Sequence, residues 1–156
     1  MNTYLIFKWL HILSATVLFG TGIGIAFFKW TIDRSGNINA IRLVNERTVL
    51  ADWLFTTPAV IAQPVSGVAL VYMGGYPLGT SWLVLAALFY ILAGCCWLPV
   101  VWLQLQMRTM ARQADAENAN LPQRYWQYTR IWFWLGVPAF SALVAVYWLM
   151  VFKPAL

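Results

Sequence analysis

The chain has 156 residues, of which 62% are hydrophobic and only 10% are charged, and its mean hydropathy is +0.68. Soluble domains carry about a quarter charged residues, so this composition excludes a soluble enzyme, a disordered chain and a secreted disulfide scaffold. The net charge of +5 does not indicate a nucleic-acid partner, because the cations stand at the ends of apolar runs and not on one polar face.

Four apolar stretches predict an all-α, four-helix transmembrane bundle that takes up residues 1–156 as a single integral membrane domain. In chain order they cover about residues 4–28, 49–72, 81–103 and 130–152. At about 20 residues per span they claim roughly 80 residues, which leaves no room for a second, soluble domain. The first stretch is too long for the apolar core of a signal peptide, and a basic flank follows it, so we expect it to stay as a helix. Pro122 marks a helical start ahead of the fourth stretch.

The distribution of positive charge predicts how the bundle is oriented. The connection between the second and third stretches, residues 73–80, holds no charge. Cytoplasmic loops are enriched in Lys and Arg, so the basic connections should face the cytoplasm and both termini should face out, across a bacterial inner (plasma) membrane. We expect the lipid bilayer, and in addition a second copy of the chain, as the partners. Eight of the ten cations lie in the other two connections or at their edges: Lys29, Arg34, Arg42, Arg47, Arg108, Arg112, Arg124 and Arg130.

The first stretch carries the single histidine of the chain, His11, at a depth where polar residues are expensive in a bilayer. At about 100° per residue, Gly22 lies on the histidine side and leaves a gap there, while Gly20 and Gly24 lie opposite and predict a close-packed neighbour. The face that offers a histidine beside empty volume suits a planar ligand. The alternative interpretation is that His11 is a structural residue near the membrane interface, hydrogen-bonded to a neighbouring helix. The spacing alone leaves both interpretations open.

The second stretch has a polar stripe at intervals of three or four residues. We expect Asp52 at its cytoplasmic end to form an interfacial ion pair with Arg47 or with an arginine of the other basic connection. Gln63 and Ser66 lie in the outer half, at the depth of His11 on the antiparallel first helix. A Gln63–histidine hydrogen bond would set the imidazole tautomer, and Pro64 frees a backbone carbonyl at the same level. The stripe consists of Asp52, Thr56, Ala59, Gln63 and Ser66.

Sulfur-bearing residues offer little independent chemistry. Cys95 and Cys96 are adjacent within the third stretch, where a disulfide between them would be strained, so we expect small buried side chains. Met73 and Met150 fall near the outer ends of the second and fourth stretches and are candidate thioether ligands or simple packing residues. A single histidine excludes a multi-histidine site within one chain, and no hydrolase or ATPase motif is present.

Several short blocks of the sequence resemble those of three membrane families. The run Phe7-Lys8-Trp9-Leu10-His11-Ile12 resembles the first helix of the HemJ family of haem-binding membrane protoporphyrinogen oxidases, and also the opening of CopD-type copper-resistance domains. The likeness continues at residues 57–61, 82–83 and 151–154. Residues 51–58 and 96–102 resemble blocks of an uncharacterised family of predicted bacterial integral membrane proteins, a domain of unknown function.

This resemblance implies haem b, bound through His11 as the metal ligand in a redox or haem-handling role. The helix spacing described above would place Gly22, Gln63 and Ser66 around it. The sixth position would then be open, or filled by a methionine or by the histidine of a second copy. The Lys and His that the HemJ pattern has in its third helix have no counterpart in residues 84–86 and 94–96. The alternative is a non-enzymatic membrane component, either a CopD-like copper-handling protein or an accessory subunit without haem. Whether the chain is an enzyme stays open.

Overall fold

The computed structural model describes residues 2–154, and within that range the regular structure is entirely helical. The elements are α1 (Thr3–Asp33), α2 (Ile38–Ala51), the π-helical turn η1 (Asp52–Thr56), α3 (Thr57–Met73), α4 (Ser81–Ala116) and α5 (Gln123–Phe152). Since α2, η1 and α3 follow one another without a break, the described chain forms 4 rods that are long and apolar enough to cross a membrane. The predicted all-α transmembrane bundle is confirmed.

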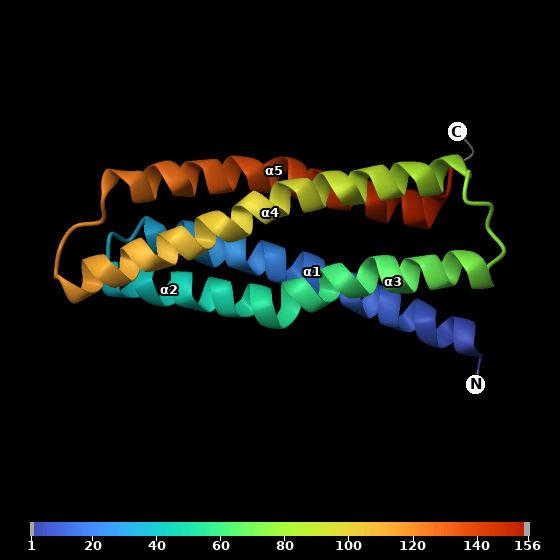
Figure 1. The fold of residues 1–156 in the computed structure, drawn as a ribbon, viewed down its shortest axis with the longest axis horizontal. Coiled ribbons are helices and arrows are strands. Elements are labelled where there is room, and N and C mark those ends of the chain that lie inside the picture. The colour runs from blue at the N-terminus through green and yellow to red at the C-terminus, as the bar shows by residue number, and fades with distance from the viewer. Residues whose placement is uncertain (1, 155–156) are drawn as a thin grey trace.

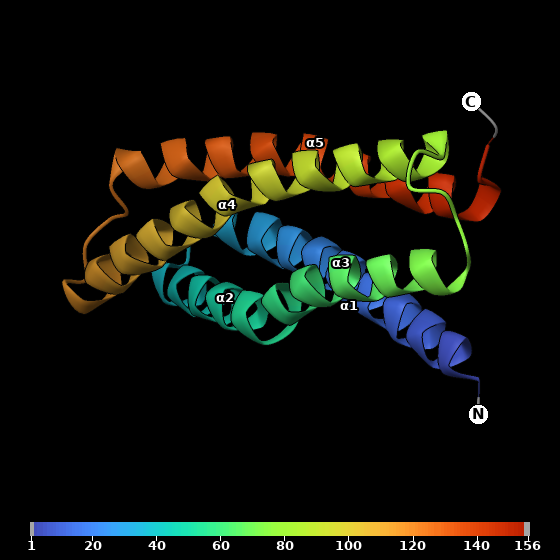
Figure 2. The same ribbon diagram turned by 45° about the vertical axis from the view of Figure 1, so that its right-hand side comes forward.

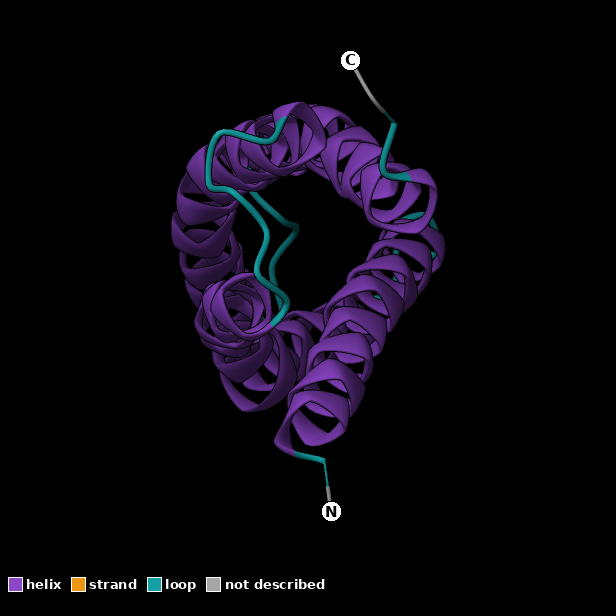
Figure 3. Ribbon diagram, turned by 90° about the vertical axis from the view of Figure 1, so that its right-hand side faces the viewer, coloured by secondary structure: helices purple, strands orange, loops and turns teal. Residues whose placement is uncertain are grey.

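Both termini lie at one end of the bundle, together with the loop between α3 and α4 (Figure 1). We call this the terminal end, and the opposite end, which carries the α1–α2 and α4–α5 connections, the loop end. α4 packs along α5, α1 packs against α3, and α2 packs against α4, whereas α1 and α5 touch at few positions. Turning the molecule shows the N-terminal half of α1 diverging from α4 and α5 (Figure 2). Viewed end-on, the helices form a ring (Figure 3).

Three of the four rods extend well beyond the apolar stretches from which they were predicted. The second rod begins at Ile38 and not near residue 49, α4 continues to Ala116 and not 103, and α5 starts at Gln123, directly after Pro122, and not at 130. Hydropathy marks only the part of a helix that matches the hydrocarbon layer, while backbone hydrogen bonds carry the helix on into polar flanks. The Asn37 side chain caps the early start of α2 by accepting a hydrogen bond from the Ala40 amide at 3.1 Å.

A proline explains the π-helical turn in the second rod. Pro58 has no N–H to donate to the carbonyl of Leu54, and its ring crowds that carbonyl. The backbone widens by one residue, so that the Thr57 amide donates to the carbonyl of Asp52, five residues back. Asp52 and Thr56, at the two ends of this turn, are both buried in the bundle.

The buried apolar residues form two separate clusters, one toward each end of the bundle. The loop-end cluster is built around Ile41, Met107 and Tyr125, and the terminal-end cluster around Trp82 and Leu149. Large apolar side chains cover the outer surface, where lipid tails would be their natural solvent. Three cavities of 470, 490 and 510 Å³ lie between the helices.

Candidate functional site

The imidazole of His11 is held against α3 by a single, well-defined hydrogen bond. Its Nδ1 lies 2.8 Å from Ser66 Oγ. The Ser66 hydroxyl has one hydrogen, which it donates to the Ala62 carbonyl at 2.5 Å, so the same oxygen accepts from His11 Nδ1–H. With the serine hydrogen on the Ala62 carbonyl, the neutral ring carries its proton on Nδ1. Nε2 then has a free lone pair, and the hydrogen bond of the ring to Ser66 is made through the other nitrogen.

Gln63 lies beside His11 as expected from the sequence, but its side chain does not bond to the ring. Its amide nitrogen donates to the His11 carbonyl at 2.7 Å and to Ser14 Oγ at 2.6 Å. The carbonyl that Pro64 leaves without a helical donor belongs to Val60, and the Tyr90 hydroxyl donates to it at 2.6 Å. Neither group is therefore the acceptor for the ring N–H, because Ser66 already fills that role. Gln63 instead ties the backbone of α1 to α3.

His11 lies between two of the three cavities, and it lines both. The 490 Å³ cavity lies among α1, α3, α4 and α5, while the 510 Å³ cavity lies between α3 and α4. Gly67 packs directly on the ring: a Cβ at this position would stand 3.3 Å from His11 Cε1. A larger residue at Gly67 would therefore displace the imidazole. We refer to the 490 Å³ cavity, with His11 in its wall, as the histidine cavity.

The structure places Gly22 outside the histidine cavity. It lies eleven residues beyond His11, about 16 Å along the helix axis at 1.5 Å per residue, and it lines the 470 Å³ cavity instead. Leu18 lies between the two and borders both cavities. The shared helix face was predicted correctly, but the bundle divides it between two spaces. Gly22 is therefore not part of a site around His11.

The expected close packing at Gly20 and Gly24 is wrong for contacts within the described chain. A Cβ added at either glycine would meet nothing within 4 Å, and Gly20 is exposed. The reason is that α1 packs mainly against the second rod, and these two glycines lie away from that contact. These glycines form an open strip on the outer surface of α1.

Two lysines and a tyrosine stand where the histidine cavity reaches the terminal end. Lys8 and Lys153 both line it, and both are exposed. Lys153 Nζ donates to the Tyr76 hydroxyl at 2.7 Å and lies 4.7 Å from the centre of the Tyr76 ring. The hydrogen bond and charge of Lys153, with a smaller contribution from Lys8, lower the pKa of the Tyr76 phenol from its usual value. The cavity thus combines an apolar interior with a basic rim.

Only one of the two candidate methionines lines a cavity that His11 also lines. Met150 lines the histidine cavity, whereas Met73 is 42% exposed at the end of α3 and lines neither cavity beside the ring. Among residues 2–154 no group of three or more His, Cys, Asp or Glu side chains is placed to hold a metal ion. Cys95 and Cys96 are free thiols on α4, and Cys95 is exposed, not buried as expected.

Asp52 does not form the expected interfacial ion pair. Its side chain is buried, with 6% of its surface exposed, and none of the salt bridges within residues 2–154 involves it. Asp52 Oδ1 accepts a hydrogen bond from Thr56 at 2.8 Å, and the residue lines the 470 Å³ cavity. The expectation is wrong because the second rod begins eleven residues earlier than predicted. Asp52 therefore lies well inside the bundle and not at its edge.

Sequence reasoning missed a closed polar cluster at the loop end. Lys29 Nζ donates to Asp33 Oδ2 at 2.9 Å, to Asn45 Oδ1 at 3.1 Å and to the Tyr125 hydroxyl at 3.0 Å. Tyr125 in turn donates to Asp33 Oδ1 at 2.7 Å and accepts from Asn45 at 2.8 Å. All three ammonium hydrogens are used, so the cluster has nothing to offer a ligand and serves to join α1, α2 and α5. Only the four-residue spacing of Lys29 and Asp33 signals it in the sequence.

Comparison with known proteins assigns the chain to a class but not to an activity. The family described as "Predicted integral membrane protein (DUF2269)" matches residues 5–154. No curated protein and no solved structure matches the chain.

Proposed function

The chain belongs to the DUF2269 family of predicted integral membrane proteins, and we propose that it binds haem b or a related tetrapyrrole between its helices, with His11 as the axial ligand. The fixed tautomer of His11 carries the proposal. Histidines that bind a metal through one ring nitrogen usually donate the other N–H to an oxygen, which sets the orientation and basicity of the ring. Ser66 supplies that oxygen here, at 2.8 Å from Nδ1, and leaves Nε2 free.

The surroundings of His11 fit a tetrapyrrole in volume and polarity. The histidine cavity measures 490 Å³, within the range of about 300–1,000 Å³ typical of sites for small molecules and cofactors. Its deeper wall is apolar and includes Phe19 and Leu143. Its rim carries Lys8 and Lys153, two cations that complement the two propionates of haem b. An apolar ligand with an anionic edge is therefore the class that this cavity accommodates best.

Each residue of the site has a separate task under this proposal. His11 Nε2 binds the metal, and Ser66 holds the ring in place. Gln63 keeps α1 and α3 in register by bonding to the His11 carbonyl at 2.7 Å. The two lysines anchor the anionic edge at the terminal end. When bound, haem would supply one-electron redox chemistry, and Met150, which lines the same cavity, would offer it a thioether.

A copper-handling role has weaker support. Copper sites use soft ligands such as imidazole and thioether groups, and usually several of them. Only His11 and Met150 line the same cavity, and Met73 lies outside it. Two ligands of this kind make an incomplete copper site. In addition, neither the apolar walls of the cavity nor its two lysines would stabilise a bare cation.

We infer further that the terminal end, and with it the mouth of the histidine cavity, faces the outside of a bacterial inner membrane. The loop end gathers eight of the ten Lys and Arg residues, and Arg42, Asp115, Glu46 and Arg112 form a chain of ion pairs there. Basic connections of this length stay on the cytoplasmic side. Lys8 and Lys153 are the exceptions, and both lie at the rim of the cavity.

The absorption spectrum of the protein purified from cells with ample haem supply tests the proposal. The wild type is expected to show a Soret band that His11→Ala abolishes. Ser66→Ala keeps Nε2 but removes the acceptor for Nδ1–H, so we expect binding weaker by about 10- to 100-fold. Gly20→Leu is the control, because Gly20 is exposed on the same helix and lines none of the three cavities. A colourless wild type, or equal colour in His11→Ala, would contradict the proposal.

A further inference from the structure

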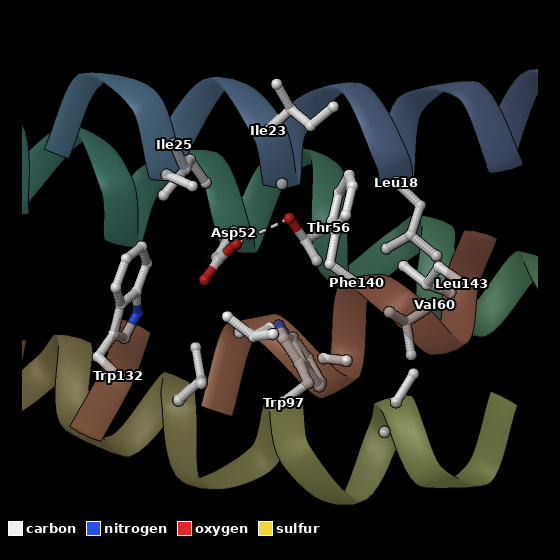
Figure 4. Close-up of a pocket in the computed structure, with 18 of the residues that line it drawn as sticks. Leu18, Ile23, Ile25, Asp52, Thr56, Val60, Trp97, Trp132, Phe140 and Leu143 are labelled. Carbon is white, nitrogen blue, oxygen red and sulfur yellow. Dashed lines mark hydrogen bonds between the residues drawn. The ribbon is translucent and has the colours of Figure 1, made fainter. Parts of the chain in front are cut away.

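The 470 Å³ cavity is a second site, separate from His11. It lies between α1, η1, α4 and α5, and it shares Leu18, Tyr90 and Leu143 with the histidine cavity. Most of its wall is apolar, yet it contains Asp52, the one buried carboxylate among residues 2–154 that has no cation beside it. We refer to it as the aspartate cavity. Figure 4 shows Asp52 near its centre, facing Trp97 and Trp132 across the open space.

Three buried polar atoms in the wall of the aspartate cavity have no hydrogen-bond partner. They are Asp52 Oδ2, Trp97 Nε1 and Trp132 Nε1. Asp52 and Trp132 are only 6% and 7% exposed. The Gln104 side chain lies close enough to the Asp52 carboxyl group to act as a hydrogen-bond donor, but its geometry gives Oδ2 no hydrogen bond in this structure. Buried polar groups are rarely left unpaired because the loss of hydration is costly. One acceptor and two donors that share a space therefore indicate a ligand that pairs with all three.

The backbone around Asp52 is built to present its carboxylate. Asp52 begins the π-helical turn, and such turns inside α-helices occur frequently at functional sites. Thr56, at the other end of the turn, donates to Oδ1 at 2.8 Å. This bond holds the carboxyl group in one orientation and leaves Oδ2 as the acceptor on the cavity side.

Glycines from three different helices make room in the same place. Gly22 of α1, Gly94 of α4 and Gly136 of α5 all line the aspartate cavity. A Cβ at any of the three would meet nothing within 4 Å. The space beside each backbone is therefore empty, while the rings of Trp97 and Trp132 supply flat apolar walls. This shape suits an aromatic ring.

The aspartate cavity opens toward the lipid. Ile23 of α1 and Phe133 and Val137 of α5 line it, and they are 46%, 44% and 45% exposed. These residues belong to α1 and α5, two helices that touch at few positions. A ligand that enters between them arrives from the hydrocarbon layer and must therefore be soluble in it.

We propose that the aspartate cavity binds a membrane-soluble hydroquinone. One hydroxyl donates to Asp52 Oδ2, and the hydroxyl oxygens accept from the indole N–H groups of Trp97 and Trp132. An amine would satisfy the carboxylate but leave both indoles unpaired. A fatty acid would bring a second carboxylate against Asp52, and a fully oxidised quinone has no hydrogen to donate to it. The proposal does not depend on haem, because no residue of the His11–Ser66 pair lines this cavity.

Calorimetric titration of decyl-hydroquinone into the protein in lipid nanodiscs, under anaerobic conditions, tests this site. Empty nanodiscs give the background of simple partition. The dimethyl ether of the same compound keeps the ring and both acceptor oxygens, is larger by two methyl groups, and cannot donate to Asp52. We expect the ether to bind about 10- to 100-fold more weakly, the loss typical of a hydrogen bond to a charged group. Binding of the hydroquinone is expected to persist in His11→Ala, which separates this test from that of haem binding.

Three variants locate the site. Asp52→Leu removes a buried carboxyl group that has no cation beside it, so the chain should fold at least as well as the wild type. The variant should bind the hydroquinone about as weakly as the wild type binds the ether. Trp132→Phe keeps the ring and removes the N–H, with an expected loss of about 5-fold. Gly94→Leu fills the open space and should abolish binding, whereas Gly20→Leu on the exposed strip should not change it. Helix content and elution volume confirm folding in each case.

Any of three results would overturn the proposal. Heat no larger than that of empty nanodiscs would mean that the cavity holds only water. Equal affinity for the hydroquinone and its dimethyl ether would mean that Asp52 is not the acceptor. Unchanged affinity in folded Gly94→Leu would place the ligand elsewhere on the protein.

Discussion

Replacing Lys29 by methionine is expected to destabilise the bundle strongly, because the lysine neutralises a buried carboxylate. Its ammonium group makes three hydrogen bonds, and its side chain and that of Asp33 are 1% and 5% exposed. Methionine keeps the length and apolar stem of the side chain, so the change removes charge and donors with little loss of packing. Asp33 is then left with the Tyr125 hydroxyl alone. Breaking a buried pair in this way costs about 3–5 kcal/mol of unfolding free energy.

The double variant Lys29→Met/Asp33→Leu separates the ion pair from the packing. Apolar replacement of both partners of a buried pair is often nearly neutral, so the double variant should be more stable than the sum of its two single variants predicts. We expect a coupling free energy of about 2 kcal/mol, within the range for residues in direct contact. Reversible unfolding in mixed micelles, followed by circular dichroism, measures each free energy.

Arg112→Met is the matched control for Lys29→Met. Arg112 also pairs with an acidic side chain, Glu46 at 2.7 Å, but it is 55% exposed at the loop end. Exposed ion pairs add little to stability, so this variant should unfold like the wild type. The reasoning would be refuted if Lys29→Met cost no more than Arg112→Met, or if the double variant cost the full sum of the single ones.

Three further outcomes are expected. Gly67→Leu should prevent haem binding while leaving the fold intact, because a Cβ at this position would stand 3.3 Å from His11 Cε1 and the leucine side chain would displace the ring. A fully pigmented Gly67→Leu protein would contradict the assigned position of the ring. Lys153→Met should raise the pKa of Tyr76, since the neighbouring cation favours the phenolate. Alkaline difference spectra, with Tyr76→Phe as the reference, measure the titration of this phenol. An unchanged titration would show that the contact does not persist in solution. A reporter enzyme that is active only outside the cytoplasm should be active when fused to the C-terminus, and inactivity there would reverse the proposed orientation.

Helical periodicity predicted the buried face of the second rod well. Asp52, Thr56, Ala59 and Ser66 are all buried, and Gln63 is half-buried against α1. The pattern succeeds because polar groups at membrane depth must turn away from lipid, so their spacing reports which face lies inside. The approach of Gln63 and Ser66 to His11 follows from the same pattern, together with the antiparallel course of consecutive spans.

The roles of individual polar residues were harder to predict than the face on which they lie. Asp52 was expected at an interface because hydropathy does not detect the polar helical turns that precede residue 49. The side chain of Ser66, and not that of Gln63, bonds to the His11 ring. Both residues lie on the same face of the helix, and periodicity does not fix the rotation of the helix closely enough to tell which of them meets the ring. The partners of Lys29 include Tyr125, 96 positions away in the sequence. Contacts of that kind depend on the packing of α5 against α1, about which a single sequence holds no information.

Titration of haem b into the haem-free protein in lipid nanodiscs tests the central claim most directly. A histidine with a free Nε2 beside a 490 Å³ cavity predicts one saturable equivalent of haem per chain, with a Soret shift that marks axial histidine ligation. His11→Ala, folded to the same helix content, should show only the spectrum of haem dissolved in lipid. Saturable binding of equal affinity and equal spectrum in His11→Ala would show that His11 is not the ligand and would contradict the account.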